Sequence, residues 1–169
     1  GRERCQRNSE GDGRRRAEAA EALVAYRDTT RDSGTGRPPP QEGGEAWLAK
    51  TGYHLAGRER PHPTPADALI AGVPELASDA GRTLARAHVA RYRADALVLP
   101  LEPFQQAIAE LGPEPAALAA RMATGLAPVL RRLATLPAEA GPAVGLVICD
   151  GSGALTFRRP LPGFSLPRH

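Results

Sequence analysis

The sequence predicts a mainly α-helical protein: a small helical bundle with a helix-turn-helix-like pair, followed by a short β-hairpin. Apolar side chains recur with a helical period between residues 79 and 133, and Pro and Gly divide that stretch into segments. After Pro137 the pattern changes to one typical of strands. In residues 1–62, by contrast, Arg, Gly, Glu and Pro replace the branched apolar residues that offset the entropy of chain ordering. We therefore expect a disordered or low-complexity N-terminal region over residues 1–62.

Within this N-terminal region the sequence favours little regular structure. Ala17 to Tyr26 could form a short helix, but isolated helices of that length are marginal. The segment GTGRPPPQEGG at residues 34–44 is typical of a linker. Order is expected to begin near Thr64.

Two helices with clear start signals come next. The first covers about residues 65–72, because the Thr64 hydroxyl can cap it and Pro65 suits its first position. Ser78 can cap the second, which runs from Asp79 to about Val98 and ends before Pro100. Its apolar stripe consists of Ala85, Val89, Tyr92 and Ala96.

Three shorter helices follow. Glu102-Pro103 opens the first, which ends at Gly112-Pro113. Glu114-Pro115 opens the second, which runs to about Met122. After the turn Ala123-Thr124-Gly125, Leu126, Val129, Leu130, Leu133 and Leu136 mark the third. The predicted core between these helices contains Phe104, Ile108, Leu111, Leu118, Met122, Leu130 and Leu133.

The last part of the chain predicts a hairpin. An apolar run over residues 143–149 is followed by Asp150-Gly-Ser-Gly153, a turn cluster, and then by a second strand-like run over residues 154–158. The glycines are not a phosphate-binding loop, because a strand and not a helix follows them.

Positive charge is concentrated near the C-terminus. Residues 121–169 contain Glu139 and Asp150 as their only acidic residues, against Arg121, Arg131, Arg132, Arg158, Arg159 and Arg168. Such an excess permits contact with a phosphate backbone, although it is also common on solvated surfaces. We take Arg121, Arg131 and Arg132 as the phosphate-contact residues, with Arg131 and Arg132 pointing outward from the second helix of the pair.

Direct reading of DNA bases by this helix pair is not favoured. A recognition helix reads bases with polar side chains near its N-terminus. Here Leu126, Ala127 and Pro128 stand at that end and cannot donate hydrogen bonds from their side chains. The pair is therefore expected to be a packing unit that contributes charge.

Signals for catalysis, metals and cofactors are weak. His88 has no Glu after it, so the HExxH arrangement of zinc peptidases is absent, and His54 and His62 flank a Pro-rich stretch. Cys5 and Cys149 are the only cysteines, and reduced thiols are expected. We predict no catalytic residue, no metal site and no cofactor, so the chain is not expected to be an enzyme. No apolar run is long enough for a membrane span and no signal pattern is present.

The residues also resemble known families. Arg91-Tyr-Arg-Ala-Asp-Ala-Leu-Val-Leu-Pro100, with the Phe104 helix and Leu118 to Leu133, resembles the region after the metal-binding helix in ImmA/IrrE-type metallopeptidase-like modules. The segment from Gly145 to Arg168 resembles the start of the C-terminal domain in Xre-family regulators of the short-chain fatty-acyl type. Together these segments lie within residues 91–168. An upstream DNA-binding helix-turn-helix, the HExxH helix and a downstream Cys-Pro-x-Trp stretch are missing.

This resemblance implies three regions: the N-terminal region over 1–62, a helical ImmA/IrrE-like domain over 63–137, and over 138–169 the start of a truncated β-containing sensing domain. It implies a fragment of a bacterial transcription regulator that contributes a sensing or interaction segment. DNA bound by the full-length protein, an acyl ligand and a second copy of the chain are the expected partners, and the cytoplasm is the expected location. Arg and not Lys as the dominant basic residue, with Lys50 the only lysine, also suggests a GC-rich bacterial source. The alternatives are a remnant of a zinc metallopeptidase-like module without its metal site, and a helical interaction module unrelated to DNA.

Overall fold

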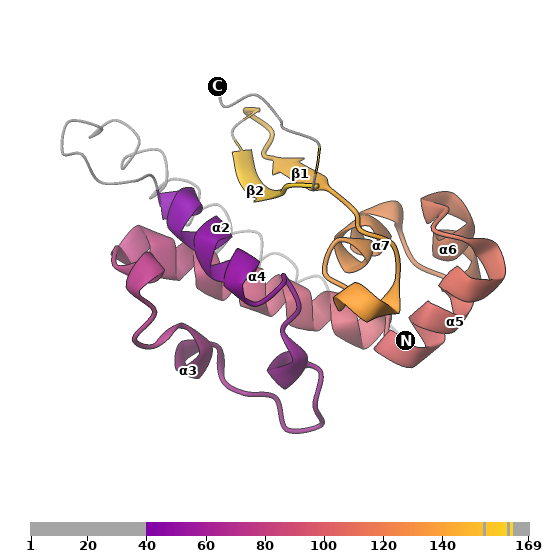
Figure 1. The fold of residues 1–169 in the computed structure, drawn as a ribbon, viewed down its shortest axis with the longest axis horizontal. Helices are drawn as coiled ribbons and strands as arrows, with labels where there is room; N and C mark the ends of the chain where they lie inside the picture. The colour runs from indigo at the N-terminus through magenta and orange to yellow at the C-terminus, as the bar shows by residue number, and fades with distance from the viewer. Residues whose placement is uncertain (1–39, 154, 162, 164–169) are drawn as a thin grey trace, which may run out of the picture.

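The structure, a computed structural model, describes residues 40–153, 155–161 and 163 (Figure 1). As the sequence predicts, this part of the chain is mainly helical and continues into a two-stranded antiparallel hairpin. The helix predicted over Ala17–Tyr26 lies outside the described residues. The elements are α2 (Pro40–Lys50), the 3-10 turn η1 (Ala56–Arg58), α3 (Ala66–Ile70), η2 (Pro74–Leu76), α4 (Asp79–Val98), α5 (Leu101–Leu111), α6 (Pro115–Arg121), α7 (Leu126–Leu133), η3 (Ala138–Ala140), β1 (Leu146–Cys149) and β2 (Leu155–Arg159).

The long helix α4 is the element around which the others are arranged, and it crosses the molecule in Figure 1. It begins where the sequence predicts, because the Ser78 hydroxyl accepts a hydrogen bond from the Gly81 N–H at 3.0 Å. Its predicted apolar stripe, Ala85, Val89, Tyr92 and Ala96, is buried. The helix therefore offers one continuous apolar face to a single hydrophobic cluster.

Residues 40–62 are not disordered, which corrects the expectation for the second part of the N-terminal region. Pro40–Lys50 form α2, and the last residues of the supposed linker, 40–44, lie inside this helix. Trp47 and Leu48 are buried in it. Gly43, one of the two glycines that suggest a linker, permits close packing, because a Cβ there would collide with the backbone carbonyl of Glu75.

The first hydrophobic cluster joins segments that are distant in the sequence. Trp47 and Leu48 of α2 pack with the apolar stripe of α4 and with Phe157 of β2. The hairpin thus shares its core with α2 and α4 and does not build a core of its own within the described residues. The buried members are Trp47, Leu48, Tyr53, Leu55, Ile70, Leu76, Ala85, Val89, Tyr92, Ala96 and Phe157.

The second cluster lies at the other end of α4, between α5, α6 and α7. Phe104, Leu118 and Leu133 are buried in it as predicted, and Ile108 and Met122 pack against its edge. The prediction is wrong for Leu111 and Leu130, whose exposed fractions are 40% and 37%. Leu111 is the last residue of α5, and Leu130 follows the buried Val129 on α7. Val129, Leu136 and Leu99 fill the core instead.

The predicted turn between α6 and α7 is present. Ala123 adopts a left-handed backbone conformation with φ 51°, and the Thr124 N–H bonds back to the Ala119 carbonyl at 3.0 Å. This closure resembles the Gly-containing ends of many helices, with Ala in the strained position.

The helix expected over residues 65–72 is shorter than predicted. Only Ala66–Ile70 is helical, Pro65 stands at its N-cap, and the Thr64 side chain makes no capping bond. The backbone of Thr64 is held elsewhere: its N–H donates to the Gly57 carbonyl at 2.9 Å, and its carbonyl accepts from Arg58 at 2.6 Å. These bonds tie the segment before α3 to η1.

The hairpin forms as the sequence predicts. In its antiparallel register Leu146 faces Arg159 and Ile148 faces Phe157, and the pairing shifts between Ile148 and Cys149. The Asp150 carboxylate closes the turn by accepting bonds from the Ser152 N–H at 2.8 Å and hydroxyl at 2.6 Å. Turn chemistry thus accounts for this segment.

Candidate functional site

A buried ion pair lies where α4, α7 and the loop after η1 meet. The guanidinium of Arg132 donates to both carboxylate oxygens of Glu59, at 2.7 and 2.8 Å, and its Nε donates to the Leu99 carbonyl at 3.0 Å. The Arg132 side chain is fully buried. Burial alone raises the pKa of Glu59, but hydrogen bonds from Arg132 and Tyr92 outweigh it, so this pKa is lowered. Both members of the pair are therefore charged, and both carboxylate oxygens of Glu59 accept a hydrogen bond from Arg132.

Tyr92 and His54 extend this ion pair into a network. The Tyr92 hydroxyl donates a short hydrogen bond to Glu59. His54 Nδ1 lies 2.8 Å from the Tyr92 hydroxyl oxygen and 3.3 Å from the Thr135 carbonyl oxygen, which fits an N–H at Nδ1. Burial, followed by the hydrogen bond to Glu59, raises the pKa of Tyr92, so this hydroxyl stays protonated and acts as a donor.

A second bidentate pair connects α7 directly with α4. Arg131 of α7 donates from Nε and Nη2 to the two carboxylate oxygens of Asp95 on α4, both at 2.7 Å. Asp95 is buried, whereas Arg131 is partly exposed. Parallel bonds of this kind fix orientation as well as distance. Two successive arginines therefore hold α7 in place, Arg131 on α4 and Arg132 on the loop after η1.

These pairs change the interpretation of the predicted phosphate-contact residues. Arg132 does not point outward, because Glu59 and the Leu99 carbonyl hold its guanidinium inside the fold. Arg131 is also turned inward, toward Asp95. Only Arg121, on α6, is largely exposed, with the Glu110 carboxylate 3.8 Å away. The structure therefore brings Arg131 and Arg132 together but leaves Arg121 apart from them.

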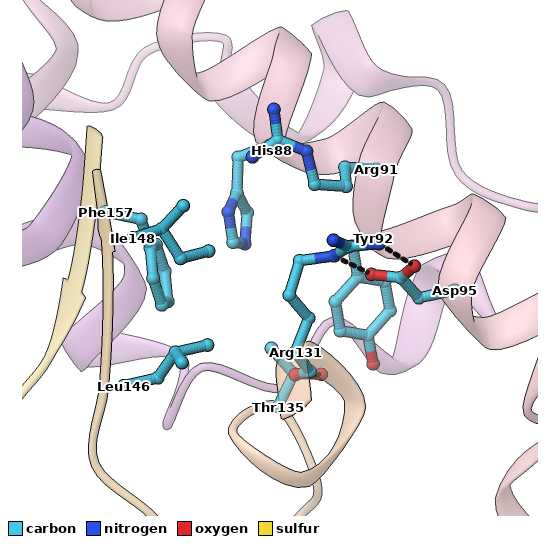
Figure 2. A pocket seen from close by; sticks show the side chains of 9 residues that line it. All are labelled: His88, Arg91, Tyr92, Asp95, Arg131, Thr135, Leu146, Ile148 and Phe157. Atoms are coloured by element: carbon cyan, nitrogen blue, oxygen red, sulfur yellow. Dashed lines mark hydrogen bonds and ion pairs between the residues drawn. The ribbon is translucent and has the colours of Figure 1, made fainter. Parts of the chain in front are cut away.

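A small cavity lies beside the Arg131–Asp95 pair. Figure 2 shows that polar side chains of α4 and α7 border it on one side, and that apolar side chains of the hairpin border it on the other. Its volume is about 10 Å³, room for about one water molecule. The residues around it are His88, Arg91, Tyr92, Asp95, Arg131, Thr135, Leu146, Ile148 and Phe157.

His88 is the most unusual group at this cavity. Its ring stacks on Phe157, with centroids 5.1 Å apart and an interplanar angle of 12°. Its Nε2 is shielded from solvent and has no hydrogen-bond partner within the described residues. Burial, followed by the nearby charge of Arg91, lowers the pKa of His88 to about 4. The ring is therefore neutral at pH 7, with one nitrogen lacking a partner.

The other chemistry-bearing residues are more ordinary. Cys149 is exposed with a free thiol, and His62 is exposed on the loop before α3. Across the part of the chain that the structure describes, no three His, Cys, Asp or Glu side chains gather in a way that suits a metal ion. Nor does any described helix combine the length and apolar character that a membrane crossing requires.

Sequence reasoning missed Glu59, His54, Asp95 and Arg91. Asp95 carried a usable signal, since it sits beside the apolar stripe of α4 between Tyr92 and Ala96 and is buried with them. Glu59 carried none, because it lies in an Arg-rich, Pro-rich segment and pairs with a residue 73 positions later. No known protein family, no characterised protein and no solved structure matches the chain.

Proposed function

We propose that this chain is a sensing or interaction segment of a bacterial transcription regulator, that it is not an enzyme, and that DNA is read by another part of the regulator. One observation supports most directly that DNA is read by another part of the regulator. Arg131 and Arg132, the two basic residues of α7, are occupied by Asp95 and Glu59. Withdrawing either arginine toward DNA would leave a buried or partly buried carboxylate without its partner, which is costly.

The exposed face of α7 supports the same conclusion. Leu126 at its start is 52% exposed, Ala127 beside it is exposed too, and Pro128 is partly exposed. Base edges in the major groove are recognised by hydrogen-bond donors and acceptors, which these side chains lack. An exposed apolar helix start is better suited to contact with protein than to contact with DNA.

The proposed sensing or interaction role rests on the resemblance to regulators of the short-chain fatty-acyl type. In this proposal the complete regulator acts in the cytoplasm, an acyl ligand and a second copy of the chain are its partners, and operator DNA is contacted outside residues 115–133.

A DNA titration tests whether this chain reads a DNA sequence. The chain is titrated against a promoter duplex and a scrambled duplex at low and at physiological salt. We expect weak binding that is equal for both duplexes and is lost as salt rises, because phosphate contacts release counterions. Arg121→Gln should weaken this binding, since Arg121 is exposed. A preference for the promoter that persists at physiological salt overturns the proposal.

A ligand titration tests whether this chain senses an acyl ligand. The melting temperature of the chain is measured with and without a short-chain acyl thioester. A ligand that binds only the folded state raises the melting temperature in proportion to its occupancy. An unchanged melting temperature over a saturating range of acyl thioesters contradicts the acyl-sensing part of the proposal and leaves the DNA result unaffected.

A further inference from the structure

An open groove lies between α3, η2 and the start of α4, and it shares no lining residue with the small cavity beside Arg131. In Figure 1, α3 lies on the side of α4 away from the hairpin. The volume of the groove is about 600 Å³, within the range of about 300–1,000 Å³ that binding clefts have. Its apolar lining consists of Ile70, Ala71, Val73, Pro74, Leu76 and Ala77.

The polar lining of this groove carries more positive than negative charge. Arg82 and Arg86 of α4 line it, with Asp67 as the only acidic lining residue. Arg86 donates to Asp67, and Arg82 donates to Asp79, but the two aspartate side chains are 76% and 98% exposed. Exposed pairs of this kind are weak, so both guanidiniums remain able to attract a further carboxylate. Arg82 is also held at the groove by the Leu76 and Ala77 carbonyls, which accept from its Nη1 at 2.9 and 3.1 Å.

The described residues begin beside this groove. A Cβ at Gly81, in the first turn of α4, would lie 3.6 Å from the Pro40 carbonyl oxygen and 4.0 Å from the Cα of Leu76, which lines the groove. The sequence before Pro40 is therefore tethered close to the groove. Residues 27–39 can span up to about 40 Å when extended. A segment joined by such a linker reaches an effective concentration in the millimolar range.

Residues 17–26, with the sequence AEAAEALVAY, have a composition that complements the groove. Glu18 and Glu21 are their only charged residues, and they are three positions apart, a spacing that places both on one side of a helix. Ala20, Leu23 and Val24 recur at the spacing of an apolar helical stripe. An isolated helix of this length is marginal in water, so it needs an apolar surface to pack against.

We propose that the groove is the docking site of residues 17–26 of the same chain, bound as a short amphipathic helix. The apolar stripe packs against the apolar lining, and Glu18 and Glu21 lie toward Arg82 and Arg86. Docking supplies the tertiary contacts that a helix of this length lacks on its own. This contact goes beyond the proposed regulatory role, since it concerns how the chain covers its own groove.

Hydrogen–deuterium exchange of the full chain tests this contact, with mass spectrometry of the peptides that cover residues 17–26. We expect their amides to exchange at least about tenfold more slowly than in a synthetic peptide of residues 14–29, because the isolated helix is mostly open. The slowing should not depend on the concentration of the chain. Exchange as fast as in the free peptide overturns the proposal. A slowing that appears only at high concentration also overturns it, because a second copy then covers the segment.

Two alanine variants locate the contact. Ala71→Glu puts a negative charge into the groove at an exposed position, so it should repel Glu18 and Glu21 and restore fast exchange in residues 17–26. Ala143→Glu is the matched control, because Ala143 is exposed and lies outside the groove, and it should leave the exchange slow. Equal exchange rates in the two variants overturn the proposal.

Two charge reversals test the acidic side of the segment. Glu21→Arg should restore fast exchange, because it brings a positive charge toward Arg82 and Arg86. Glu10→Arg makes the same change outside residues 17–26 and should leave the exchange slow. Each rate is compared with that of the free peptide of the same sequence. Slow exchange that persists in the Glu21 variant contradicts the proposed pairing. None of these results depends on how the chain interacts with DNA or with acyl thioesters.

Discussion

Glu59 and Arg132 lie 73 positions apart in the sequence and meet in a bidentate ion pair, in which the Arg132 side chain is fully buried. The pair connects the loop after η1 with α7, and Tyr92 of α4 donates to the same carboxylate. One interaction thus involves both hydrophobic clusters of the fold. Its loss is expected to destabilise both clusters.

Removing one partner of this pair should be strongly destabilising. We expect Arg132→Ala to lower the free energy of unfolding by about 3–5 kcal/mol, because Glu59 keeps its charge in a partly buried place without a counterion. Urea denaturation measures the change. Arg121→Ala, the exposed control, should stay within about 0.5 kcal/mol of the original chain. Similar values for the two variants would show that the buried pair does not stabilise the fold.

Stability should fall as the pH drops below neutral because of His88. Its pKa in the folded chain is about 4, against 6.5 for an ordinary His. Between these values the unfolded chain binds a proton that the folded chain does not, so the free energy of unfolding decreases as pH falls from about 6.5 to about 4. Below about 4 both states are protonated and this contribution is gone.

The measurement for His88 is a series of urea denaturations at successive pH values. His88→Gln should flatten the decline between about pH 6.5 and 4, since no proton is then taken up at this position. His62→Gln, on an exposed ring, should keep the decline. A decline of the same slope in the His88 variant would contradict the prediction.

Two leucines of the helix-turn-helix-like pair should respond very differently to the same substitution. Leu118 of α6 is fully buried, whereas Leu126 of α7 is 52% exposed. Leu118→Ala should cost about 2–5 kcal/mol, because it removes buried methyl groups and leaves a cavity. Leu126→Ala should change stability by less than about 0.5 kcal/mol. A comparable cost at both positions, measured by urea denaturation, would mean that Leu126 is covered.

The turn before α7 should accept glycine with a gain in stability. Ala123 has φ 51°, a conformation that costs a residue with a Cβ about 1–2 kcal/mol. Ala123→Gly should therefore stabilise the chain by up to about 1 kcal/mol after the larger entropy of the unfolded glycine chain is subtracted. Ala120→Gly, inside α6, should instead destabilise by about 0.5–1 kcal/mol. Thermal melting that moves in the same direction for both variants would rule out strain at Ala123.

Local signals predicted the helices and the hairpin well, because α4 and the hairpin turn are specified by neighbours in the chain. Ser78 caps α4 three residues away, and Asp150 closes its turn two residues away. The error at residues 40–62 has the opposite origin. Trp47 and Leu48 are buried against α4 and the hairpin, and Gly43 is needed where α2 approaches η2, so tertiary contacts outweigh weak local propensity.

The candidate site was less predictable for the same reason. A helical pattern shows which residues share a face, but Arg131 and Arg132 look equally suited to solvent and to a buried carboxylate. The difference is made by Asp95, 36 positions earlier, and by Glu59. Neither partner can be identified from the periodicity of α7 itself.

The contact between the first and last described elements has a consequence for synthesis on the ribosome. Glu45 of α2 pairs with Arg158 of β2, 113 positions later, and Trp47 shares its cluster with Phe157. A chain that emerges from its N-terminus must wait for residues 155–159 before α2 obtains these partners. Contacts of such long range delay folding, since loop closure precedes the gain from burial. The last strand therefore sets the earliest moment at which the nascent chain can complete its first core.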